Sequence, residues 1–250
     1  SQQHKTNIFG YGSSYTQQLI PAYNQISKER KSIRFNVVTS HCIASATLIS
    51  RSSTPQKTRA CRRIFKEYIN WFLEKSNSGD ILIIAESMSA YSKNNKLSIY
   101  DSSNTQTSLS SSESIQIRAK EINDLAVKLE NQEKTLIYVS GIPYLMRDPE
   151  TCGQWFSSAN ASGCNSIDPK SKGYQYLPYT SISAKIKKSV IRADIFSAFE
   201  KDSTHLKGSL SELFYNRDHI NTKGALFIAP YLDKAIGISI KDRRSISPKH

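Results

Sequence analysis

Short apolar runs alternate with longer amphipathic segments along most of this chain of 250 residues. The run at residues 80–85 (DILIIA) is apolar after its first residue, which is typical of a central strand buried on both faces of a parallel sheet. Residues 55–76 place six large apolar side chains on one face at helical spacing. Strands separated by helices need right-handed crossovers, so the pattern predicts an α/β fold with a parallel sheet. Strands are expected at 6–9, 33–38, 80–85, 135–140 and 190–195, and helices at 16–27, 55–76, 113–131 and 221–236.

Three segments lack a clear period. Residues 87–114 are rich in Ser and Asn and are expected to form a long loop. Residues 144–179 are interpreted as an irregular excursion from the fold, and residues 239–250 as a frayed basic tail. We expect residues 1–238 to form one domain, because 38% hydrophobic content in a chain of this length can bury a large core.

The formal net charge of +13 favours an anionic partner, either a nucleic acid, an acidic glycan or a membrane surface. The simpler alternative is that the lysines are solvated surface residues without a specific partner. Aromatic residues do not interleave with the basic runs as they do in nucleic-acid-binding modules, so no nucleic acid is expected. No run of about 18 apolar residues is present, so nothing in the chain is expected to span a membrane. The first residue is not Met, and we expect the chain to be part of a longer protein.

The four cysteines, Cys42, Cys61, Cys152 and Cys164, fall two in each half of the chain. They form no C-x-x-C motif and have no histidine at zinc-ligand spacing, so no metal site is expected. Two local disulfides, Cys42–Cys61 and Cys152–Cys164, would each staple an irregular segment and would indicate an oxidising compartment. The alternative is four unpaired buried thiols.

The residue types for nucleophilic catalysis stand at opposite ends of the chain. Ser13 and Ser14 follow Gly12 where the first strand meets the first helix, and His219 precedes the last helix. In an α/β fold both regions lie at the carboxyl ends of the strands, where a histidine can activate a serine hydroxyl. The simpler alternatives are a helix-capping serine and a solvent-facing loop histidine.

The segment IFGYGSSYTQQLIPA (residues 8–22) resembles the first conserved block of SGNH (GDSL-like) hydrolases. It is most similar to SGNH domains fused to membrane acyltransferases of family 3, in which the serine lies seven residues before the proline of a Gln-Leu-x-Pro-Ala helix. That register selects Ser14, counted back from Pro21. The segment FYNRDHINTKGA (residues 214–225) is similar to the last block, Asp-x-x-His-Leu-Ser-x-x-Gly-Ala, and selects His219. The resemblance covers about residues 6–236 and implies a three-layer α/β/α sandwich with about five parallel strands.

The chain departs from this pattern at the third member of the catalytic set. Asn216 occupies the position of the family's aspartate, and an amide can orient an imidazole without stabilising its positive charge. Asp218 is a possible orienting acid, although adjacent loop residues usually point in different directions. The resemblance places oxyanion donors at Ser14, Ser40 and Ser87, with Ser87 near the family's asparagine.

The resemblance implies a periplasmic O-acetyltransferase domain, attached to the inner membrane through a missing N-terminal membrane domain that delivers the acyl donor. Ser14 would carry the acetyl group to a hydroxyl of a cell-surface polysaccharide such as lipopolysaccharide O-antigen, with His219 as base and then acid. No cofactor is implied. The alternatives are a carbohydrate acetyl esterase of the same fold and a catalytically weakened glycan-binding domain.

Overall fold

The computed structural model describes residues 5–40, 42–50, 54–92, 97–100, 105–152, 163–202 and 209–246. A five-stranded sheet runs through the centre in the order β2-β1-β4-β7-β8, and every neighbouring pair is parallel. The expectation of about five parallel strands is therefore confirmed. The strands are β1 (Thr6–Gly12), β2 (Ile33–Thr39), β4 (Ile81–Ala85), β7 (Thr135–Val139) and β8 (Ile191–Ala193).

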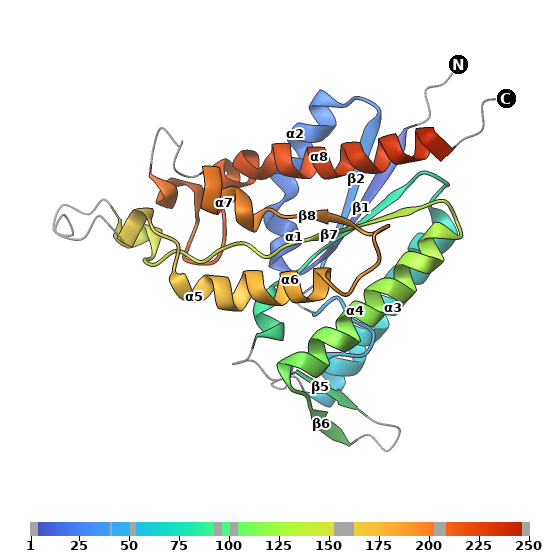
Figure 1. Ribbon diagram of the computed structural model, residues 1–250, viewed down its shortest axis with the longest axis horizontal. Coiled ribbons are helices and arrows are strands. Elements are labelled where there is room, and N and C mark those ends of the chain that lie inside the picture. Colours follow the sequence, from blue (N-terminus) through green and yellow to red (C-terminus); the bar gives the residue numbers. More distant parts are fainter. Residues whose placement is uncertain are drawn as a thin grey trace.

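Helices cover both faces of this sheet, which makes three layers (Figure 1). Successive strand residues point to opposite faces, so Ile8 and Ile83 enter one apolar core while Phe9 and Leu82 enter the other. The three-layer sandwich is confirmed. One face carries α1 (Ser14–Gln18), α2 (Ile20–Glu29), α7 (Phe196–Asp202) and α8 (Thr222–Ile246), and the other carries α3 (Pro55–Lys75), α4 (Ser111–Glu130) and α6 (Leu177–Ser183).

The loop expected at residues 87–114 is wrong in part. It contains the short 3₁₀ helix η1 (Met88–Tyr91) and two strands, β5 (Leu97–Tyr100) and β6 (Gln106–Ser108). Together with β3 (Ile49–Ser50) these strands form a small antiparallel sheet. All three residues of β6 are exposed, so this edge strand lacks the apolar alternation by which a strand is recognised in a sequence.

The irregular excursion expected at residues 144–179 also contains regular structure. Beyond the 3₁₀ turn η2 (Pro149–Thr151), a continuous helical path runs through α5 (Pro169–Ser171), the π-helix η4 (Lys172–Tyr176) and α6. The change from α to π and back to α interrupts the 3.6-residue period. The sequence pattern therefore misses this helical segment.

The frayed tail expected from residue 239 is a further correction, because α8 continues to Ile246. Ser239 is 1% exposed and Ile240 packs against the core, so this turn of helix is held by tertiary contact. Within the described residues, no helix is both long and apolar enough to cross a membrane.

Both expected disulfides are present. Cys42–Cys61 ties the segment after β2 to α3, and Cys152–Cys164 closes a loop in the segment before α5. In the described part of the chain there is no free cysteine.

A buried ionic cluster fastens α4 to the end of β4. Arg118 Nε donates to Oε1 of Glu86 at 2.8 Å, and both side chains are at most 3% exposed. Tyr91 and Tyr138 donate to the same carboxylate, each at 3.3 Å. Burial raises the pKa of Glu86, and pairing with Arg118 offsets only part of that effect.

Replacing Arg118 with Ala should lower the free energy of unfolding by about 3–5 kcal/mol, because the Glu86 carboxylate would then be buried without its counter-charge. Arg63→Ala is the matched control: its side chain is 72% exposed, and its pairing with Glu67 should contribute less than about 1 kcal/mol. Urea denaturation followed by circular dichroism measures both. Equal losses in the two variants would contradict a structural role for the cluster.

Candidate active site

The sheet topology locates a crevice between β1 and β4. Along the chain β1 is followed by β2, which pairs with one side of β1. The next strand of the same sheet, β4, pairs with the other side of β1. Ligands in open α/β sheets bind at the carboxyl ends of the strands where the order reverses in this way. Gly12 and Ala85 are the last paired residues of these two strands, so the residues that follow them border the crevice.

Ser13 and Ser14 have different structural roles. Ser13 is the N-cap of α1, and its carbonyl accepts the backbone N–H of Thr16 at 2.9 Å. Ser14 is the first helical residue, so its hydroxyl is not used as a cap and its N–H has no carbonyl within the helix to bind. Thr16 then donates its hydroxyl to Ala85 O at 2.8 Å, which holds α1 against the end of β4.

A tight hairpin presents His219. Phe214 and Ile220 form an antiparallel bridge, and between them Asn216 Oδ1 accepts the backbone N–H groups of Asp218 and His219 at 3.1 and 2.9 Å. The hairpin is anchored to the first helix, because Gln18 Oε1 accepts the N–H of Ile220 at 2.6 Å. Gln18 lies one helical turn beyond Ser14, so one face of this segment meets both His219 and its hairpin.

His219 bridges the serine and an acid. Its Nε2 lies 3.1 Å from Ser14 Oγ, and its Nδ1 lies 2.7 Å from Asp218 Oδ1. An ionised carboxylate can only accept, so Nδ1 carries the proton and Nε2 is left to accept the serine O–H. The hydrogen bond from His219 is the main reason that the pKa of Asp218 lies below its usual value, which keeps the carboxylate ionised at neutral pH.

The structure changes the expected division of roles between Asn216 and Asp218. Asn216 Oδ1 does face His219 Nδ1, at 3.1 Å, but it also accepts the two backbone donors that shape the turn. Asp218 was expected to point elsewhere and instead turns back to the imidazole at a shorter distance. The turn around Asn216 brings the adjacent side chains together. Both side chains therefore contact the imidazole, and only Asp218 brings a charge.

Of the three oxyanion candidates, Ser14 lies at the start of α1, and Ser40 and Ser87 are placed differently from each other. The N–H of Ser40 extends the sheet by donating to Gly12 O at 2.8 Å, and its hydroxyl donates to Tyr11 OH at 3.2 Å. Its polar groups are thus engaged away from Ser14. Ser87 lies two residues beyond Ala85, beside the crevice, with its hydroxyl 2.8 Å from that of Ser89.

Sequence reasoning missed the neighbours of these groups. Tyr15, which follows Ser14, is buried, and its ring centroid lies 6.1 Å from that of His219. Its hydroxyl accepts from the amide of Gln175, which also donates to Tyr144 OH. Position beside Ser14 is the only sequence signal for Tyr15, and Gln175 has none because it lies in the π-helix.

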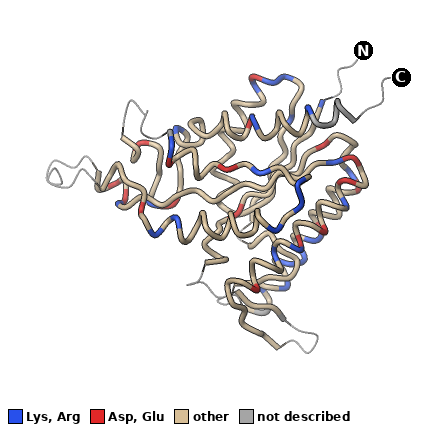
Figure 2. The backbone as a smooth tube through the Cα atoms, in the orientation of Figure 1, with Lys and Arg blue, Asp and Glu red and all other residues tan. Residues whose placement is uncertain are grey.

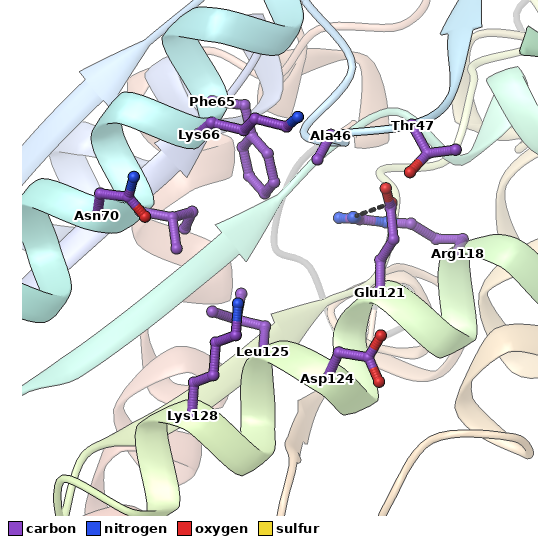
Figure 3. Close-up of a pocket in the computed structure, with 11 residues that line it drawn as sticks. Ala46, Thr47, Phe65, Lys66, Asn70, Arg118, Glu121, Asp124, Leu125 and Lys128 are labelled. Carbon is purple, nitrogen blue, oxygen red and sulfur yellow. Dashed lines mark hydrogen bonds and ion pairs between the residues drawn. The ribbon is translucent and has the colours of Figure 1, made fainter. Parts of the chain in front are cut away.

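A separate hollow of about 370 Å³ lies between α3 and α4 (Figure 3). Lys66, Arg118 and Asp124 line it together with apolar side chains, and none of the catalytic candidates reaches it. Of its charged groups, Arg118 contacts Glu121 at 3.3 Å. This hollow is distinct from the serine–histidine site.

The profile of the family described as SGNH domain (fused to AT3 domains) matches residues 2–234. The chain belongs to this family. Among curated proteins, none matches the chain significantly. In this SGNH domain Ser14, His219 and Asp218 form a continuous chain of hydrogen-bond contacts.

Solved structures share the fold of this SGNH domain. The periplasmic domain of a Salmonella ser. Paratyphi A lipopolysaccharide acetyltransferase superimposes with a TM-score of 0.62 at 12% identity, over 94% of this chain and 85% of that one. A protein from Slackia heliotrinireducens described as an SGNH hydrolase gives 0.55 at 11% identity, over 93% and 100%. A variant of an acetyl-xylooligosaccharide esterase from Geobacillus stearothermophilus gives 0.54 at 12% identity, over 94% and 96%. At these identities the likeness concerns the fold alone.

Exchanging the charge between the two contacts of His219 should separate their roles. Asp218→Asn should lower kcat for p-nitrophenyl acetate by about 10²–10⁴-fold, because the imidazolium would lose its carboxylate. Asn216→Asp should change kcat much less, since Asp218 is already in place.

The double variant Asn216→Asp/Asp218→Asn restores one carboxylate beside Nδ1 and should recover part of the activity. Circular dichroism controls for folding in all three variants. Full activity in Asp218→Asn would show that Asp218 is not the orienting acid.

Proposed function

We propose that this SGNH domain transfers an acetyl group, through a serine acyl-enzyme, to a hydroxyl of a cell-surface polysaccharide such as lipopolysaccharide O-antigen. The observation that carries the proposal is the chain of contacts from Ser14 Oγ through His219 to Asp218, at 3.1 and 2.7 Å. A fold of this family with such a set suits esterase or acyltransferase chemistry. The family's fusion to AT3 domains supports a membrane partner that delivers the acyl donor, and with it a periplasmic location at the inner membrane.

The transfer takes place in two steps, acetylation of Ser14 and then its deacetylation by the acceptor. Ser14 Oγ attacks the carbonyl carbon of the donor while His219 Nε2 takes the hydroxyl proton, and the donor's leaving group departs with that proton. The acceptor hydroxyl then attacks acetyl-Ser14 and gives its proton to His219. As Ser14 leaves, it regains the proton, and the acceptor carries the ester. Asp218 stabilises the imidazolium in both steps.

The alternative acceptor is water, which would make the domain a carbohydrate acetyl esterase. Both reactions need the same nucleophile and base, and the fold is shared with an acetyl-xylooligosaccharide esterase as well as a lipopolysaccharide acetyltransferase domain. The contact between Ser14 and His219 argues against the remaining alternative, a glycan-binding domain without catalysis.

The charge distribution is relevant to the choice of partner. Figure 2 shows Lys and Arg in several separate segments of the chain, including the turn after α2, helix α3 and the segment before β8. A nucleic-acid interface needs a continuous basic surface. The distribution therefore supports a glycan acceptor over a nucleic acid.

Ser14→Ala should lower turnover of p-nitrophenyl acetate by at least about 10³-fold without unfolding the domain, because no other group replaces the nucleophile. Mass spectrometry of the wild type after rapid acid quenching should find one acetyl group on the peptide that contains Ser14.

Ser13→Ala is the matched control, since it should mainly lower stability by about 1 kcal/mol through loss of the helix cap. Acetylation of Ser13 in place of Ser14 would overturn the assignment. Comparing acetate release with acetyl transfer to added O-antigen polysaccharide then separates the esterase from the transferase.

Tyr215 is a candidate contact for the acceptor. Its side chain is 70% exposed, on the hairpin that carries His219, and its backbone N–H donates to His219 O at 2.7 Å. An exposed aromatic ring offers a rigid, amphipathic surface for a polar ligand with apolar faces.

Tyr215→Ala should raise KM for a polysaccharide acceptor by about 2–10-fold, the equivalent of about 0.5–1.5 kcal/mol of aromatic contact. The substitution should change KM for p-nitrophenyl acetate less, because that substrate has no sugar to contact. Steady-state kinetics with the two substrates measure the difference. An equal effect on both would indicate that the residue supports the hairpin and not the acceptor.

A further inference from the structure

A buried amide joins three segments at the edge of the sheet that carries Ser14. Gln175 is 0% exposed, and its Nε2 donates to Tyr144 OH at 2.7 Å and to Tyr15 OH at 3.0 Å, and reaches Ser87 Oγ at 3.4 Å. Its Oε1 accepts the backbone N–H of Met88 at 2.9 Å. We call Tyr15, Ser87 and Tyr144 the hydroxyl cluster.

The hydroxyl cluster borders the crevice between β1 and β4. Ser87 follows Ala85, which pairs with Gly12, and Ser14 is the second residue after Gly12. Tyr15 is the next residue after Ser14 and lies beside His219. Ser87 and Tyr144 follow β4 and β7, whereas the hairpin with His219 precedes α8 and is anchored to α1 through Gln18.

Gln175 determines the direction of the hydrogen bonds in this cluster. An amide nitrogen donates and cannot accept, and its two hydrogens serve the nearest oxygens, Tyr144 OH at 2.7 Å and Tyr15 OH at 3.0 Å, with Ser87 Oγ a more distant third contact at 3.4 Å. Each hydroxyl that accepts from the amide consequently keeps its own hydrogen for another partner. Ser87 and Tyr144 are only partly buried, so their hydroxyl groups can reach a ligand, and in the 2.8 Å contact of Ser87 with Ser89 either hydroxyl can be the donor. Burial raises the pKa of Tyr15 well above its usual value and keeps it protonated.

Two structural details show that the amide has a dedicated place. The π-helix η4 carries Gln175, and single π turns inside helices are frequently found at functional sites. A Cβ atom on Gly141, just after β7, would lie 2.2 Å from Gln175 Oε1, so the absence of a side chain there makes room for the amide.

We propose that Gln175 is a positioning residue that orients the hydroxyls of Ser87 and Tyr144 to donate hydrogen bonds to the acyl carbonyl oxygen as Ser14 attacks. This inference rests on the proposed function. As the C=O bond opens, its oxygen becomes negative and is stabilised by these two O–H groups and by the backbone N–H of Ser14. No proton is transferred to the oxyanion, which re-forms the carbonyl when the leaving group departs.

Gln175→Glu tests the direction of these hydrogen bonds with little change in size. A carboxylate accepts where the amide donates, so the hydroxyls of Ser87 and Tyr144 would turn inward to it and would no longer face the substrate. We expect kcat for p-nitrophenyl acetate to fall about 10²-fold, as for loss of an oxyanion donor, with little change in KM. Gln116→Glu, at an exposed position of α4, makes the same exchange away from the site and should leave kcat unchanged.

Two further variants keep the test decisive if a buried carboxylate at position 175 unfolds the domain. Ser87→Ala and Tyr144→Phe each remove one donor and leave Gln175 in place, and each should lower kcat. A trifluoromethyl ketone, whose adduct with Ser14 carries an oxyanion, should bind more weakly to each variant by the same factor by which kcat/KM falls. A purely structural role would not make the two losses equal.

Unchanged kcat and unchanged inhibitor affinity in both Ser87→Ala and Tyr144→Phe would overturn the inference, whatever happens to Gln175→Glu. Absence of turnover and of an acetylated Ser14 in the wild type would overturn the proposed function itself, and this inference with it. The wild-type measurement therefore distinguishes the two failures.

Discussion

Where β1 ends beside β4, the position of Gly12 has no room for a side chain. A Cβ atom on Gly12 would lie 1.8 Å from the carbonyl oxygen of Ala85 and 2.2 Å from the hydroxyl of Thr16. Because Gly12 lacks that atom, the chain can turn directly over β4, and Thr16 can bond Ala85 O. This close approach sets the position of Ser14, and through it the distance to His219 and to the hydroxyls beyond β4.

The site divides into a basic and an acidic half with different physical origins. On one side, the carboxylate of Asp218 and the turn around Asn216 orient the imidazole that accepts the serine proton. On the other, the amide of Gln175 donates to Tyr144 OH and contacts Ser87 Oγ, the two hydroxyls that we propose as donors to the substrate. In the proposed reaction the first half would stabilise the imidazolium that His219 becomes on taking the serine proton, and the second would stabilise the oxyanion of the substrate. Ser14 lies between them, where the reaction separates these charges.

A feature can be predicted from the sequence when it depends on residues that are close together in the chain, and it is missed when it depends on contacts between distant segments. The strands of the main sheet and the turn to Ser14 depend on local pattern, and the structure has them close to where they are expected. The direction of Asp218 depends on a turn that Asn216 shapes with its side chain, which no spacing rule reveals. Gln175 acts through partners from three other segments and lies in a π turn without helical period, so nothing near it in the chain indicates its contacts. The all-exposed strand β6 escapes notice for a similar reason.

The contact between Ser14 and His219 joins residues 205 positions apart, while the acid and the turn that serve His219 are its immediate neighbours. The hairpin is therefore held by local contacts, whereas the contact with the serine requires the two ends of the chain to meet, as α2 and α8 do where Arg30 binds Asp233 at 2.7 Å. A contact between residues so far apart in the chain closes a long loop, and such contacts tend to form slowly. Ester hydrolysis by the proposed site, followed during refolding, would thus report without any added label the moment at which the two ends of the chain come together.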